Sequence, residues 1–121
     1  MLTLPPSVHI WMASKPVDLR RGIDGLLALV RTQWATDPYS GHLFVFVSRG
    51  KNRVKILYWD RGGFVVFYKR LELGTFRLPK VEPGCEKVVL SSTDLAMLLD
   101  GIRYQRVKRP AWWKPSAEKM G

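Results

Sequence analysis

Residues 58–72, YWDRGGFVVFYKRLE, place five aromatic rings and three cations around one short turn. Cations bind phosphate groups and aromatic rings stack on bases, so this mixture is typical of a surface that contacts nucleic acid. Aromatic residues and arginine are also enriched at the hot spots of protein–protein interfaces. A third interpretation is a hydrophobic core edged by solvated charges. The segment alone leaves these three interpretations open.

The distribution of charge favours a polyanion as the partner. The chain of 121 residues has 20 Lys and Arg against 10 Asp and Glu, a formal net charge of +10. Residues 49–70 carry seven cations and one acid, and residues 102–121 carry six cations and one acid, so two segments hold the whole imbalance. Such an excess is typical of proteins that bind nucleic acid. The residues that we predict to bind DNA are Arg49, Lys51, Arg53, Lys55, Trp59, Arg61, Tyr68, Lys69, Arg70, Arg106, Lys108 and Arg109.

Residues arranged for catalysis are not evident in the sequence. It contains no P-loop, no G-x-G-x-x-G and no H-E-x-x-H motif. A two-metal nuclease needs several carboxylates that converge on one point, and most aspartates here already have a cap or turn explanation. His9 and His42 are expected at strand edges or in loops, and Cys85 as an inert thiol. We therefore expect no catalytic residue, no metal site and no cofactor, and hence no enzyme.

The cysteine content and hydropathy indicate a cytoplasmic protein. A single cysteine excludes an internal disulfide and suits a reducing compartment. No apolar run approaches the ~18–20 residues of a membrane span, so no membrane association is expected. The first residues lack the basic lead of a signal peptide.

Segments rich in strand formers dominate the elements that must position these residues. Short edge strands are expected at GTFRLP and KVVL. Two short turns, RGKN and DRGG, predict that residues 42–48, 53–59 and 64–71 form an antiparallel meander. The longer segments are residues 7–13, 42–48, 53–59 and 64–71.

A longer amphipathic helix is predicted between the first two of these strands. Apolar residues at helical spacing place it over residues 18–34, with Asp18 as its N-cap. Gly22 and Gly25 inside this helix each cost up to ~1 kcal/mol relative to alanine. That cost suggests a close approach of the helix backbone to the sheet or to a ligand.

The first turn of this helix would carry Arg20 and Arg21, either solvated or holding an anion at the helix N-terminus. A second, short helix is predicted at SSTDLAMLLDGI. The predicted fold class is α+β, with an antiparallel sheet of four to six strands packed against the longer helix. Residues 1–102 are expected to form a single domain, and residues 103–121 a flexible basic tail.

The turn DRGG also predicts which residues face each other. A turn centred on Arg61 and Gly62 sets Trp59 opposite Phe64 and Arg53 opposite Arg70. Two opposed arginines repel unless an anion or an acidic partner lies between them. A register shifted by one residue would instead pair Arg53 with Lys69, again two cations. Leu57 and Val66 share a face with these cations, which we expect to be the outer face of the sheet. Tyr58 and Phe67, on the other face, are expected in the core.

Three blocks of the sequence resemble a known family. They are VDLRRGIDGLLALV, DPYSGHLFVFVSRGKNRVKILYWDRGGFVVFYKRLELGTFRLP and LSSTDLAMLLDGI, and together they span about residues 8–102. They are similar to the TnpB-type accessory protein of insertion-sequence-66 elements, the second open reading frame of these bacterial transposons. The resemblance implies a bacterial cytoplasmic protein encoded beside a separate, larger transposase that carries the strand-transfer chemistry.

Two functions fit this resemblance. The first is a non-catalytic accessory protein that binds DNA at the transposon ends and helps to assemble the transposase there. The second is a protein adaptor that docks the transposase through its aromatic and basic face without binding DNA itself. The dependence of binding on salt separates them, because phosphate contacts weaken steeply with salt.

Overall fold

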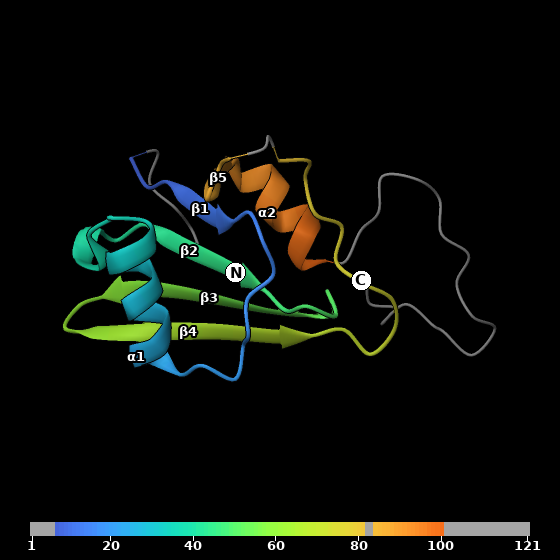
Figure 1. Ribbon diagram of the computed structural model, residues 1–121, viewed down its shortest axis with the longest axis horizontal. Coiled ribbons are helices and arrows are strands. Elements are labelled where there is room, and N and C mark those ends of the chain that lie inside the picture. The colour runs from blue at the N-terminus through green and yellow to red at the C-terminus, as the bar shows by residue number, and fades with distance from the viewer. Residues whose placement is uncertain (1–6, 82–83, 101–121) are drawn as a thin grey trace.

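A five-stranded sheet with strand order β4-β3-β2-β1-β5 organises the fold (Figure 1). The computed structural model describes residues 7–81 and 84–100. None of the helices within these ranges is long and apolar enough to cross a membrane. The elements are β1 (Ile10–Ala13), α1 (Ile23–Ala28), the π-helical turn η1 (Leu29–Gln33) that continues α1, the 3₁₀ turn η2 (Pro38–Ser40), β2 (Leu43–Val47), β3 (Arg53–Asp60), β4 (Gly63–Arg70), β5 (Lys87–Leu90) and α2 (Ser92–Leu99).

The hairpin of β3 and β4 has the predicted register. Arg53 pairs with Arg70 at its open end, and Trp59 pairs with Phe64 beside the turn. The two turn residues, Arg61 and Gly62, both have positive φ angles, of 42° and 88°. These angles are typical of the type I′ turn, whose twist matches that of the flanking strands. Antiparallel pairing of β2 with β3 completes the predicted meander.

The pairing of β1 differs from the all-antiparallel sheet that we expected. β1 is parallel to β2, with Ile10 opposite Leu43, and antiparallel to β5, with Ile10 opposite Leu90. The cause is the connection between β1 and β2, which contains α1. A helical crossover returns the chain to the end of the sheet at which β1 begins, so β2 runs in the same direction as β1. The α+β class is confirmed, with a mixed and mostly antiparallel sheet.

The longer helix begins at Ile23, five residues later than predicted, and its N-cap is Gly22. Asp18 does not cap this helix, because its carboxylate accepts a bond from the backbone N–H of Arg20 in the turn before it. At the glycines, the helix backbone does not approach the sheet closely, contrary to one of the two expectations. Gly22 has open space around it, and a Cβ at Gly25 would meet only the side chain of Arg21.

Two hydrophobic cores lie on opposite faces of the sheet. The first joins α2 to the face that contains Met12, Val45 and Ile56. The second joins α1 to the opposite face, which contains Phe46 and Leu57 (Figure 1). Because the five β2 residues are all buried, this strand is covered by side-chain contacts on both faces.

The two cores correct our assignment of the hairpin faces. Leu57 is completely buried and Val66 packs beside it, although we expected this face to be the outer one. Phe67 is 39% exposed, although we expected it in the core, and Tyr58 is half-buried against the α2 core. The reason is that α1 covers the turn end of the supposed outer face. Only the other end, near Arg53, stays open.

The segment after β4 packs without forming the strand that we expected at GTFRLP. Phe76 is buried in the α2 core, and its N–H donates to the carbonyl of Lys51 at 2.6 Å. β5 confirms the strand at KVVL, and α2 confirms the second helix. Ser91 and Asp94 form a capping box at the start of α2. The predicted basic tail lies outside the described residues.

Candidate nucleic-acid interface

A groove of about 780 Å³ opens at the uncovered end of the α1 face. Three segments form it: the loop before α1, the turn between β2 and β3, and the open end of the β3–β4 hairpin. Its charged and aromatic lining residues are Asp18, Arg20, Arg49, Arg53, Lys55 and Tyr68. Four cationic side chains therefore share this groove with one carboxylate.

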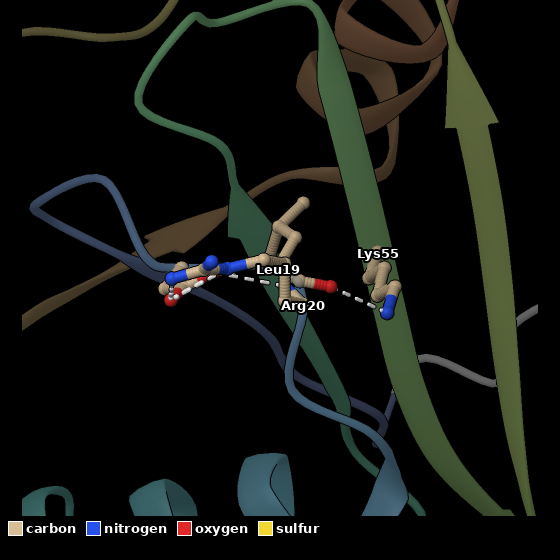
Figure 2. A network of polar contacts seen from close by, with 4 residues as sticks. Leu19, Arg20 and Lys55 are labelled. Carbon is tan, nitrogen blue, oxygen red and sulfur yellow. Dashed lines mark hydrogen bonds and ion pairs between the residues drawn. The ribbon is translucent and has the colours of Figure 1, made fainter.

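Lys55 fixes the loop before α1 against the sheet. Its Nζ donates to the carbonyl oxygens of Leu19 at 2.7 Å and Arg21 at 3.0 Å. Figure 2 shows the Lys55 side chain reaching from β3 to the Leu19 carbonyl. The N–H of Val17 adds a backbone bond to Val47 at 2.9 Å. The wall of the groove is thus anchored to β2 and β3, and Lys55 adds an ammonium charge to the lining.

The turn between β2 and β3 positions two further arginines. The N–H of Ser48 donates to the Arg53 carbonyl at 3.0 Å, and the Ser48 hydroxyl accepts from the Arg53 N–H at 3.1 Å. The N–H of Lys51 closes the turn by donating to the Ser48 carbonyl at 2.9 Å. Backbone bonds therefore hold Arg49 and Arg53 at the rim, while their side chains stay exposed.

The only acid in the lining is paired with a cation of the same loop. Arg20 donates through Nε to Asp18 Oδ1 at 3.0 Å and through Nη2 to Oδ2 at 2.8 Å. The hydrogen bond from Arg20 is the main cause that lowers the pKa of Asp18, and the same bond raises the pKa of Arg20. Asp18 therefore remains ionised, and it offsets Arg20 while leaving the charges of Arg49 and Arg53 uncompensated within the lining.

A second cavity, of about 360 Å³, lies beside Trp34 and Cys85. Its charged lining residues are one cation, Lys15, and one acid, Glu86, so it lacks the basic excess of the groove. This cavity offers no comparable attraction for a polyanion.

Comparison with known proteins decides the family. Residues 8–109 match the family described as IS66 Orf2 like protein. The chain belongs to the IS66 Orf2-like family. The resemblance inferred from the three sequence blocks is confirmed, and membership associates the chain with transposition.

Two relatives of this IS66 Orf2-like chain come from Sinorhizobium fredii (strain NBRC 101917 / NGR234). The uncharacterized protein y4jC is 38% identical over 109 residues, which cover 90% of this chain and 92% of the relative. The uncharacterized protein y4hO is 32% identical over 116 residues, covering 96% and 97% of the two chains. No solved structure is significantly similar to the chain.

The fold of this family member brings four of the predicted DNA-binding residues into the groove. They are Arg49, Arg53, Lys55 and Tyr68. Arg70 lies opposite Arg53 on the same face, and it forms an exposed ion pair with Glu72 at 2.9 Å. Residues that are up to 19 positions apart in sequence, from Arg49 to Tyr68, therefore meet because the hairpin folds back on β2.

Other predicted residues lie apart from the groove. Arg61 is at the closed end of the hairpin, and Lys51 is in the β2–β3 turn without lining the groove. Trp59 packs edge-to-face in a three-ring cluster, with its ring centre 5.0 Å from those of both Tyr39 and Phe64. Lys69 faces α2 and donates to a backbone carbonyl there. Arg106, Lys108 and Arg109 lie outside the described residues.

Arg20 and Asp18 line the groove, but neither is among the predicted DNA-binding residues. The signal for Arg20 was the pair of adjacent arginines after Leu19, for which an anion site was one interpretation. That interpretation assumed a helix N-terminus. The arginines instead precede the helix, in the loop that Lys55 holds.

The two histidines contact each other in the structure. His42 Nδ1 accepts a hydrogen bond from the backbone N–H of His9 at 2.9 Å. The parallel pairing of β1 and β2 brings the two residues together. Among residues 7–81 and 84–100, no group of three or more histidine, cysteine or acidic side chains is arranged to hold a metal ion. Cys85 is exposed.

Proposed function

We propose that this chain is a non-catalytic accessory protein of transposition that binds DNA through the groove. Its role would be to help the separate, larger transposase assemble on the transposon ends. The proposed location is the bacterial cytoplasm, where the element DNA lies. Family membership supports the link to transposition, and the charge of the groove supports DNA as a partner.

The observation that carries this proposal is the convergence of cations from three segments on one concavity. Within the described part of the chain, Arg53 forms no ion pair, yet it lies opposite another arginine, Arg70. Facing like charges destabilise a sheet, and a phosphate between or beside them would remove that cost. Long-range attraction of DNA to such a surface also accelerates binding.

The basic segment 102–121 supports the same partner on electrostatic grounds. Its six cations and one acid would add to the attraction of DNA, with Arg106, Lys108 and Arg109 as the proposed contacts. Trp112 and Trp113 in the same segment would then be available to stack on bases.

The adaptor function remains the second candidate, and an exposed aromatic side chain favours it. Phe67 lies on the edge strand β4, on the face opposite to the groove, and is 39% exposed. Large exposed apolar side chains on an edge strand suit a protein partner. In this alternative, the transposase would bind at β4 and the chain would not bind DNA itself.

A binding experiment with matched variants tests the proposal. Mobility shifts with element-end DNA and with random DNA, each with and without the transposase, measure the affinity of the wild type. We expect Arg49→Ala with Arg53→Ala to weaken binding to both DNAs and to reduce the salt dependence. Arg31→Ala removes one exposed cation of η1, outside the groove, and should reduce the affinity less than removal of either groove arginine.

The result also separates the two candidate functions. If the wild type binds neither DNA at low salt but still binds the transposase, the adaptor function is supported and the DNA-binding proposal is contradicted. If the groove variant and the wild type bind DNA equally, the groove is not the DNA site.

A further inference from the structure

Tyr68 places an exposed aromatic ring among the cations of the groove. Its side chain comes from β4, directly opposite Lys55 of β3, and 51% of the residue is exposed. The Lys55 Nζ lies 5.6 Å from the centre of the Tyr68 ring. Phosphate-binding groups and a ring with accessible surface thus occupy one concavity.

The ring of Tyr68 is less engaged than that of the other exposed tyrosine. Tyr39 is equally exposed, but it packs against Trp59 at 5.0 Å and Phe64 at 5.2 Å. Within the described residues, Tyr68 has no such ring contact, and the Lys55 ammonium lies near its ring. The Lys55 ammonium contacts one part of the Tyr68 ring and leaves much of the aromatic surface exposed to water. Such a surface gains free energy when a second flat group stacks on it.

We infer that the groove takes an unpaired nucleic-acid strand, with one base stacked on Tyr68 and the neighbouring phosphates bound by Arg49 and Arg53. This inference rests on the proposed function and names the form of nucleic acid that the groove binds. In a duplex, both faces of each internal base are covered by adjacent bases, so the duplex offers Tyr68 a stacking surface only at its two ends. An unpaired base offers such a surface whatever its sequence.

The size of the groove points to the same form. Its volume of about 780 Å³ lies within the ~300–1,000 Å³ range of pockets that hold one small molecule. A concavity of this size accommodates a nucleotide or two of one strand, whereas a duplex would contact only the rim. The rim arginines would still attract duplex DNA through its phosphates, so the inference concerns a preference and not an exclusive specificity.

Fluorescence anisotropy with three labelled probes tests this preference. The probes are an oligothymidylate of about 12 nucleotides, an oligouridylate of the same length, and a blunt duplex of the same length. Wild-type protein should bind a single strand more tightly than the duplex. The tighter of the two single strands identifies DNA or RNA as the source of the strand.

Three single substitutions assign the preference to the ring. Tyr68→Leu should weaken single-strand binding by about tenfold, the effect of losing one base–aromatic stack, while duplex binding changes little. Tyr68→Phe keeps the ring and should retain most of the affinity. Phe67→Leu is the matched control, because Phe67 is the adjacent exposed aromatic residue and faces away from the groove. It should leave all three affinities unchanged.

The possible failures are distinguishable. Equal binding of the single strand by wild type and a folded Tyr68→Leu variant would overturn the inference and leave DNA binding by the groove intact. A wild-type preference for the duplex would do the same. Absence of binding to all three probes at low salt would contradict the proposed function and the inference together. Circular dichroism of each variant establishes that it is folded.

Discussion

Arg53 of β3 and Arg70 of β4 lie directly opposite each other at the open end of the hairpin. Arg70 has a carboxylate neighbour, because its Nη2 lies 2.9 Å from Glu72 Oε2. Arg53 instead lines the groove together with Arg49 and Lys55. The hairpin thus retains two facing cations at its open end, where Arg53 lines the groove. The ion pair with Glu72 offsets the charge of Arg70, but within the described residues Arg53 forms no ion pair. A facing pair of like charges that is only partly compensated is typical of a functional surface.

Substitution of both opposed arginines should separate DNA binding from stability. For Arg53→Ala with Arg70→Ala, we expect weaker binding to all DNA sequences and a salt dependence reduced by about two units, one for each lost phosphate contact. The free energy of unfolding should stay equal or rise slightly, because the repulsion between the arginines is removed. Binding titrations over a series of salt concentrations and urea unfolding measure the two effects. An unchanged salt dependence in the folded double variant would contradict the assignment of these residues.

Lys55 should stabilise the fold in addition to its electrostatic role. Lys55→Met removes the two bonds to the carbonyls of Leu19 and Arg21. Because hydrogen bonds from a charged donor contribute about 1.5–3 kcal/mol, we expect the free energy of unfolding to fall by about 1–3 kcal/mol in urea. Lys51→Met is the control, since Lys51 is exposed and does not line the groove. Equal stability of the two variants would show that the Lys55 bonds contribute little.

Lys69 should anchor the end of α2. Its Nζ donates to the Leu99 carbonyl, one of the last carbonyls of the helix, where a positive charge also interacts favourably with the helix dipole. In Lys69→Met, we expect faster amide hydrogen exchange in the last turn of α2 and a loss of about 1–2 kcal/mol in stability. Hydrogen-exchange mass spectrometry measures the local effect. Exchange that accelerates equally in all strands and helices would indicate a global effect and contradict local anchoring.

The free energy of unfolding should decrease when the pH falls below about 6.5. Burial, and then the charge of His9, lower the pKa of His42 from its ordinary value of 6.5. As the pH falls through 6.5, the unfolded chain binds a proton at this residue before the folded chain does, so folding becomes less favourable. The decrease ends once the pH is below the folded pKa. Protonation of Nδ1 would also remove the acceptor for the His9 N–H.

Urea unfolding at about pH 7.5 and about pH 5.5 measures this dependence. The control is His42→Asn, which keeps a side-chain acceptor near the His9 N–H but does not titrate in this range. Its stability should vary less with pH than that of the wild type. The same pH dependence in both proteins would assign the effect to other groups.

The sequence by itself determined the local structure of the hairpin and showed which segments carry the excess of cations. A two-residue turn with a glycine at its second position fixes the register, because few residues adopt the positive φ that this turn requires. Since register follows from the turn, the sequence also predicted that Arg53 and Arg70 face each other. The capping box of α2 is equally local, because Ser91 and Asp94 are three positions apart and bond within one helical turn.

The tertiary structure decided which face of the hairpin is covered and where the groove lies. β3 has apolar residues on both faces, such as Ile56 and Leu57, so the alternation of the strand does not distinguish the core from the surface. Packing of α1 over Leu57 makes that choice, and the same packing leaves the end near Arg53 open. One wall of the groove is the loop before α1. Lys55 holds this loop through a bond to Leu19, which is 36 positions away in the sequence. Contacts of this separation depend on the packing of whole elements, which no local pattern of residues specifies.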